Sequence, residues 1–238
     1  MQYIDAYTYY FDNENWVLNL LLTTVCQLIP VVGPIVMLGY EYELIVAKHR
    51  RTAETYPDFD FGRFTDYLTR GIWPFLVQMI LWMALVPVIM VVFLFIAVPA
   101  GLLAQGPQAQ PMMPLLMFPA MFLVMIVLQI VSVLVITPLA LRAGLMQNFG
   151  QAFDMAFVKD FIHRMWWETI VASLFLVITG WILMMLGMLA CFIGMYPAIT
   201  LVQLAHTHLI WQLYELYLDR GGMPIPLVED QVIMAVRV

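Results

Sequence analysis

Two long stretches of the chain, residues 71–129 and 169–205, contain no Asp, Glu, Lys or Arg. Each is far longer than the roughly 20 apolar residues that a helix needs to cross the hydrocarbon core of a bilayer. The whole sequence is 63% hydrophobic and only 11% charged, whereas soluble domains are about 45–50% apolar and about 25% charged. These features predict an all-α, polytopic integral membrane helix bundle.

Polar and Pro/Gly-rich segments between the apolar runs set the boundaries of the predicted transmembrane helices. One break is the charge-free sequence QGPQAQP at 105–111, and a shorter one is CFIGMYP at 191–197. We therefore predict a single membrane domain, residues 1–238, with four transmembrane helices at 71–98, 115–141, 166–191 and 194–217.

The ten basic residues predict the orientation, because Lys and Arg in short loops stay on the cytoplasmic side. They precede the first of the four helices, lie between the second and third, or follow the fourth, and none lies in either break. We expect a multi-pass protein of the cytoplasmic (inner) membrane with its tail, residues 218–238, in the cytoplasm. The first fifteen residues contain no Lys or Arg, so we expect no cleaved signal peptide.

The N-terminal apolar segment, residues 16–46, is interrupted near its middle by Pro30, Gly33 and Pro34. Proline removes a backbone donor and clashes with the preceding turn of a helix, so two helices are expected to meet at this break. The segment forms either a re-entrant membrane hairpin, which places the N-terminus inside, or one kinked span, which places it outside. We favour the hairpin because the prolines come as a pair.

Residues 145–165 predict an amphipathic helix that lies along the membrane interface. Phe149, Phe153, Phe157 and Phe161 recur every four residues, and most of the polar residues fall on other faces. One interpretation is a contact surface for a partner protein or for lipid. The alternative is that these rings are ordinary aromatic anchors at the headgroup level.

Polar groups inside a bilayer are costly, so they are candidates for function. Gln203, His206 and Thr207 lie in the last predicted span, and Gln203 and His206 share one helical face. They form a candidate intramembrane polar site, unless they only bond neighbouring helices or lie near the cytoplasmic end. Glu41 and Glu43 stand where the first apolar segment ends, and we expect a solvated helix end there.

The sequence predicts neither an enzyme nor a metalloprotein. It has no Walker loop, no dinucleotide fingerprint and no nucleophile elbow, so we assign no catalytic residue and no cofactor. No metal-ligand spacing occurs, because a residue separates His206 from His208 and the two point to different faces of a helix. The formal charge of −6 argues against a nucleic-acid partner.

Several short phrases resemble an uncharacterised family of small polytopic prokaryotic membrane proteins, a domain of unknown function. They are DNENW (12–16), IPVVGP (29–34), GY (39–40), YPDF (56–59), RGIWP (70–74), QLYELY (212–217) and RGG (220–222). The resemblance implies a helical membrane fold. It implies no established activity and no catalytic residues.

Two functional hypotheses follow from the sequence. The first is a non-enzymatic structural or accessory protein that contacts membrane lipids and packs against other membrane subunits or a second copy of itself. The second is a small-solute or lipid transporter that uses the broken N-terminal segment and the polar residues of the last helix. The scarcity of charge within the predicted spans favours the first hypothesis.

Overall fold

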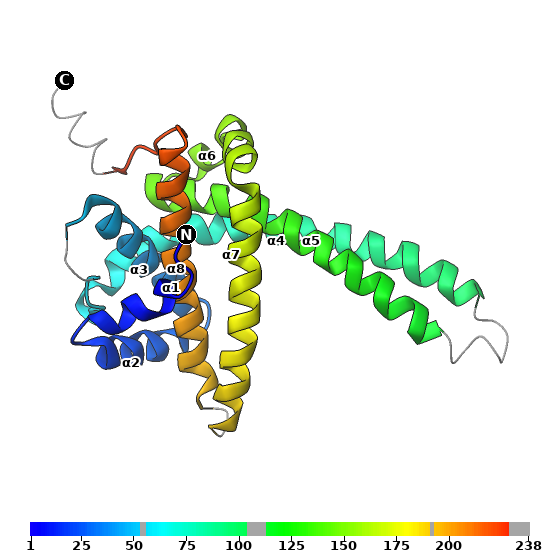
Figure 1. Ribbon diagram of the computed structural model, residues 1–238, viewed down its shortest axis with the longest axis horizontal. Helices are drawn as coiled ribbons and strands as arrows, with labels where there is room; N and C mark the ends of the chain where they lie inside the picture. The colour runs from blue at the N-terminus through cyan, green and yellow to red at the C-terminus, as the bar shows by residue number, and fades with distance from the viewer. Residues whose placement is uncertain (53–55, 104–112, 191–192, 229–238) are drawn as a thin grey trace.

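The computed structural model describes residues 1–52, 56–103, 113–190 and 193–228 (Figure 1). Within these ranges every regular element is helical, which confirms the predicted all-α class. The predicted break at 105–111, residues 191–192 of the second break and residues 229–238 of the tail lie outside the described residues. The elements are α1 (Asp5–Thr8), η1 (Tyr9–Asp12), α2 (Trp16–Gln27), α3 (Val32–Arg50), η2 (Phe61–Arg63), α4 (Phe64–Leu103), α5 (Met113–Met146), α6 (Phe149–Ala152), α7 (Met155–Leu189) and α8 (Met195–Asp219).

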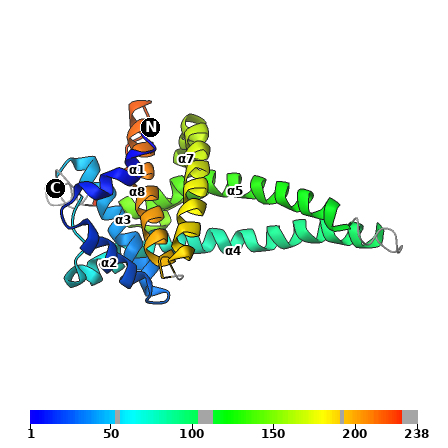
Figure 2. The ribbon, with the colours of Figure 1, turned by 60° about the horizontal axis from the view of Figure 1, so that its bottom comes forward.

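Helices α4 and α5 form a long hairpin that projects sideways from a body built mainly of α1, α2, α3, α7 and α8 (Figures 1 and 2). At about 1.5 Å per residue, α4 extends to about 60 Å, or about twice the thickness of a hydrocarbon core. Toward the tip, the hairpin exposes large apolar side chains, among them Phe95 and Phe122. This surface is suited to lipid or to another apolar protein surface.

Three helices in the described part of the chain are long and apolar enough to cross a membrane. They are Phe61–Ile96, Met121–Met146 and Met155–Leu189, and the most apolar stretch of the first has no buried residue. Apolar surface of this extent is stable in lipid and not in water. The predicted class, a helical membrane protein, is thereby confirmed.

The fourth predicted span, residues 194–217, forms helix α8, but α8 is not among these three helices. Polar residues such as Gln203 and Thr207 lower its hydropathy. It packs against α1, α2, α3 and α7 and runs through the body beside α7 (Figure 1). Helix α8 is thus more polar than these three helices, and the fourth transmembrane span stays a prediction.

The predicted interfacial helix at 145–165 is wrong as a separate element. Only residues 149–152 form a short helix, α6, and α7 then runs without a break from Met155 to Leu189. The Asp154 carboxylate caps α7 by accepting hydrogen bonds from the backbone N–H groups of Ala156 (3.0 Å) and Phe157 (3.3 Å). No proline or glycine follows until Gly180, so nothing ends the helix at the boundary that we predicted near residue 166.

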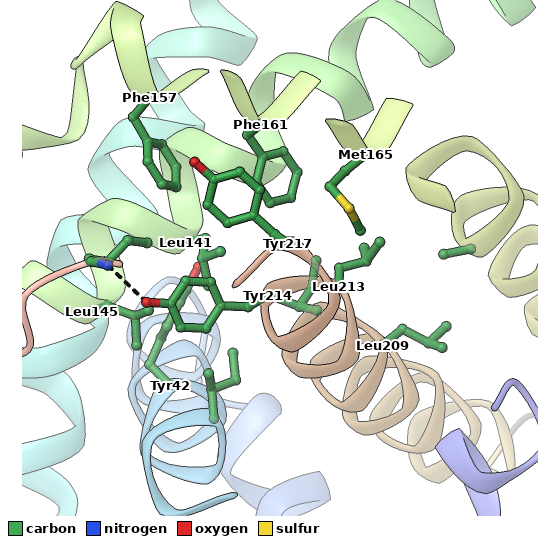
Figure 3. Close-up of a cluster of buried hydrophobic side chains, with 14 of the residues drawn as sticks. Tyr42, Leu141, Leu145, Phe157, Phe161, Met165, Leu209, Leu213, Tyr214 and Tyr217 are labelled. Atoms are coloured by element: carbon green, nitrogen blue, oxygen red, sulfur yellow. Dashed lines mark hydrogen bonds between the residues drawn. The ribbon is translucent and has the colours of Figure 1, made fainter. Parts of the chain in front are cut away.

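The periodic phenylalanines do not form one exposed contact surface. Phe157 and Phe161 are buried against Tyr217 of α8, with ring centroids 5.5 and 5.1 Å away (Figure 3). Phe149 and Phe153 are half-buried and pack against a second cluster formed with α4 and α5. The predicted partner or lipid contact is thus wrong for the first pair, because the apolar face of this segment meets α8.

The predicted break in the N-terminal segment is confirmed. Helix α2 ends at Gln27, and α3 begins at Val32 with Pro34 in its first turn, where proline is tolerated. Between them Val31 adopts a positive φ of 65°, and the two helices then pack against each other. The segment is therefore a helical hairpin, and α2 alone, about 18 Å long, is too short to span a bilayer.

Helices α3 and α4 cross at very close range because each contributes a glycine to the contact. A methyl group at Gly39 would overlap the backbone carbonyl of Tyr67, and one at Gly71 would overlap that of Ile35. Small residues permit such close backbone approach between membrane helices. The crossing fixes α3 between α4 and α8, which sets the position of the acidic side chains of α3.

Candidate functional site

A cavity of about 420 Å³ lies where α3, α4, α5, α7 and α8 meet. Its volume falls within the roughly 300–1,000 Å³ of typical small-molecule sites. The wall is mainly apolar, as in such sites, and polar side chains interrupt it. Those from α4, α5 and α7 are Gln78, Gln129, Ser132, Thr137, Thr169 and Ser173.

Helix α8 contributes Gln203, His206 and Thr207, and the structure places all three of these predicted site residues on the cavity wall. Thr207 is buried, and its hydroxyl donates to the backbone carbonyl of Gln203 at 2.9 Å. The Gln203 side chain accepts a hydrogen bond from Gln27, the last residue of α2. His206 is exposed. The helical break of the N-terminal segment therefore adjoins the polar wall of the cavity.

Glu41 of α3 is the acidic residue on this wall, and only 6% of its surface is exposed. Thr207 of α8 lines the same wall of the cavity. In the part of the chain that the structure describes, no Lys, Arg or His forms an ion pair with it. The expectation of a solvated helix end is wrong here, because α8 covers the face of α3 that carries Glu41.

Glu43 differs from Glu41 although it is only two residues away. Its carboxylate accepts two hydrogen bonds from the guanidinium of Arg63, at 2.5 and 2.7 Å, and lies 4.0 Å from Arg70. Residues two apart on a helix point to different faces. One carboxylate of α3 is therefore neutralised outside the cavity, and the other faces the cavity without a cationic partner among the described residues.

Four exposed residues on the wall mark the mouth of the cavity, the apolar Trp82 and Val177 and the polar Gln129 and His206. Trp82 of α4 is 49% exposed and Val177 of α7 is 45% exposed. Both belong to helices that are long and apolar enough to span a membrane. The cavity thus opens sideways between the α4–α5 hairpin and α7, toward the apolar surface of the protein.

His208 faces away from the cavity. Its ring lies 4.3 Å from that of Tyr9 and 5.2 Å from that of Trp211, and the Lys48 ammonium lies over both of those rings at 4.3 and 4.9 Å from their centroids. His206 and His208 thus lie on different faces of α8. Among the described residues, no group of three or more His, Cys, Asp or Glu side chains is placed to hold a metal ion.

A second polar cluster surrounds Asp58, in the loop before α4. Its carboxylate accepts hydrogen bonds from the side-chain amides of Asn13 (2.9 Å), Asn15 (2.8 Å) and Asn19 (2.8 Å). The amide of Asn19, with those of Asn15 and Asn13, holds the pKa of the Asp58 carboxyl below its ordinary value. The cluster connects two of the sequence motifs that carry the family resemblance, DNENW and YPDF. Its residues do not line the cavity, and they stabilise the packing of the body.

Comparison with known proteins identifies a family but no function. The model of the family described as "Protein of unknown function (DUF4013)" matches residues 22–192. No curated protein matches the chain, and no solved structure matches it. The matched range includes α3, α4, α5 and α7, which form four of the five sides of the cavity.

Proposed function

The chain belongs to the DUF4013 family, whose function is unknown, and we propose from the cavity that it is a membrane transporter for small solutes. The single observation that carries this proposal is the cavity of about 420 Å³ between membrane helices, with the buried Glu41 on its wall. Buried ionisable groups at membrane depth are costly and typically mark solute or ion pathways.

The broken N-terminal segment supports the same function. In many transporters, discontinuous helices expose backbone groups beside the substrate site. Here the break follows Gln27, and the Gln27 side chain bonds Gln203 on the cavity wall. A movement of α2 against α3 would therefore reach the cavity directly, which is the kind of coupling that alternating access requires.

We also propose that the protein is a multi-pass protein of the cytoplasmic membrane with its C-terminus in the cytoplasm. Arg142, Arg164 and Arg220 support this orientation, because they gather where α5 ends, α7 begins and α8 ends. Arg220 donates a hydrogen bond to the backbone carbonyl of Arg164, and Arg142 pairs with Asp154 at 2.9 Å. Clustered basic residues favour the cytoplasmic side. A C-terminal fluorescent fusion should be bright, whereas a periplasmic C-terminus would give an active alkaline phosphatase fusion instead.

Transport is tested with purified protein in liposomes, by measuring uptake of a panel of small labelled solutes that includes neutral, anionic and cationic compounds. The expected result is saturable uptake of at least one class, reduced in the cavity variants Gln203→Ala and Thr207→Val. Thr69→Val is the matched control, because Thr69 is exposed on α4 and lies outside the cavity. Absence of saturable uptake for every class would remove the transport function.

A second candidate function is a structural or accessory membrane subunit, and the α4–α5 hairpin favours it. The hairpin exposes large apolar side chains and extends well beyond the body (Figure 2), so it offers surface to other subunits or to a second copy. The test is native mass spectrometry after extraction in mild detergent. A stoichiometric complex, or a homo-oligomer lost on shortening the hairpin, is expected from this candidate, whereas a monomer in every detergent contradicts it.

A further inference from the structure

We propose that the cavity binds an organic monocation, an ammonium group attached to an apolar body, with the Glu41 carboxylate as its counter-charge. This inference rests on the proposed function, because it names the class of solute that would occupy the same site. Charge, the aromatic wall and the position of the mouth each support it.

The wall of the cavity carries one acidic side chain, Glu41. An isolated ionised carboxylate is costly to bury and is stabilised by a proton or by a cationic partner. Glu41 has no ion-pair partner among the described residues, and the cavity is the open space in front of it. The other titratable side chains on the wall are His206 from α8 and Tyr42 from α3, while α4, α5 and α7 contribute none. The site thus offers one negative charge, which selects a monovalent cation.

The wall of the cavity also carries aromatic side chains. Trp82 from α4 and Tyr42 from α3 line the same cavity. The faces of Trp and Tyr attract ammonium groups, and aromatic walls with a carboxylate are the usual means of binding alkylated amines. The carbonyl oxygens of Gln78 and Gln129 add neutral acceptors. Since most of the remaining wall is apolar, the cation is expected to carry hydrocarbon.

The position of the mouth indicates how a solute reaches the cavity. It opens between α4 and α7, where Trp82 and Val177 are about half exposed, and both helices present apolar surface suited to lipid. A solute that arrives there partitions first into the membrane. Amphiphilic amines do so, because their hydrocarbon part enters the acyl region and the ammonium stays near the headgroups. The mouth therefore favours an amphiphilic cation over a fully hydrated ion.

The test uses the full-length protein in nanodiscs and benzyltrimethylammonium, whose positive charge does not depend on pH. Its uncharged isostere, neopentylbenzene, is the matched ligand control. The measurement is the dissociation constant from thermal-shift titrations at constant ionic strength. We expect saturable binding of the cation and at least roughly tenfold weaker binding of the isostere, because the isostere lacks the charge that attracts the Glu41 carboxylate and the aromatic rings.

The matched protein variants are Glu41→Gln and Glu43→Gln, on the same helix. Glu41→Gln should weaken binding of the cation at least roughly tenfold, because the charge–charge attraction is lost. Glu43→Gln should leave binding unchanged, because Glu43 pairs with Arg63 outside the cavity. Glu41→Asp keeps the charge and should retain binding, so it serves if Glu41→Gln fails to fold.

A pH series separates the charge of Glu41 from a purely structural role. Affinity for benzyltrimethylammonium should rise with pH in the wild type, because the cation competes with a proton for the carboxyl group of Glu41, and this dependence should vanish in Glu41→Gln. His206→Gln should retain it, since an exposed imidazole is not the counter-charge.

Three results would overturn the proposal: equal affinity for the cation and its isostere, unchanged affinity in Glu41→Gln, or displacement by sodium at equal concentration, which would indicate an inorganic cation site. Cation binding without flux in liposomes would leave this inference intact and remove transport. Uptake of neutral solutes without cation binding would support transport and contradict the binding of an organic cation.

Discussion

Asn19 and Asp58 lie in different segments of the chain, and the Asn19 amide donates a hydrogen bond to the Asp58 carboxylate at 2.8 Å. The carbonyl oxygen of the same side chain accepts from the backbone N–H of Phe59 at 3.0 Å. Asn19 is 1% exposed, so both of its polar ends are satisfied inside the protein. This pair ties α2 to the loop that leads into α4, and it thereby holds the N-terminal hairpin on the body.

Loss of the Asp58 carboxylate is predicted to destabilise the protein. Asp58→Ala leaves the buried amide of Asn19 and that of Asn13 without this acceptor, and each buried unsatisfied donor costs about 1–3 kcal/mol. Thermal unfolding in detergent should show a clearly lower midpoint for Asp58→Ala. The control is Asp66→Ala, whose side chain is 71% exposed and pairs only loosely with Arg63, at 3.8 Å. Equal midpoints for the two variants would contradict a structural role for the cluster.

Asp58 also predicts a pH dependence of stability. Its pKa is lowered in the folded protein, chiefly by the amide of Asn19, so the folded state favours the charged form. The contribution of Asp58 to the free energy of unfolding is complete above the ordinary pKa of an aspartate. It is lost as the pH falls through the lowered pKa of the folded protein. The stability difference between the wild type and Asp58→Asn should therefore shrink between neutral pH and about pH 3. A difference that stays constant over this range would exclude the linkage.

The glycine at the α3–α4 crossing predicts a steric effect. Gly39→Ala should lower stability strongly, because the new methyl group would overlap the backbone carbonyl of Tyr67, and backbone does not move aside as a flexible side chain does. Gly180→Ala is the matched control, since a methyl group there meets only the side chain of Val202 at 3.6 Å. The yield of monodisperse protein and its unfolding temperature provide the readout. A tolerated alanine at 39 would mean that the helices cross less closely.

The features of the fold that depend on residues close together in the sequence could be predicted. Pro30 and Pro34 lie four residues apart with Gly33 between them, and this combination favours a helix break, so the break between α2 and α3 could be placed from the sequence. Single prolines are accommodated inside α4 and α5. The helical period placed Gln203 and His206 on one face of α8, and the cavity wall contains both. The uncharged runs gave the three apolar helices for the same reason, because hydropathy needs no knowledge of the partner helices.

The burial of Glu41 could not be predicted in this way. Its neighbours in sequence, Tyr40 and Glu43, suggested the end of an apolar segment, and only the packing of α8 against α3 buries it. The same holds for Phe157 and Phe161, whose four-residue period indicates an apolar face but not whether that face meets lipid or Tyr217. Amphipathic patterns identify a face, and long-range packing decides what covers it.

A cavity that a small organic cation can enter lies at the junction of the five helices, and thiol labelling with a cationic reagent measures this access directly. In a background that lacks both native cysteines, Ser132→Cys places a thiol on the cavity wall at a residue that is 6% exposed. Met165→Cys is the control, because Met165 is fully buried and lies outside the cavity. The predicted result is that aminoethyl methanethiosulfonate modifies Ser132→Cys, more slowly when benzyltrimethylammonium is present, and leaves Met165→Cys unmodified. A Ser132→Cys protein as unreactive as the Met165→Cys control would contradict the account.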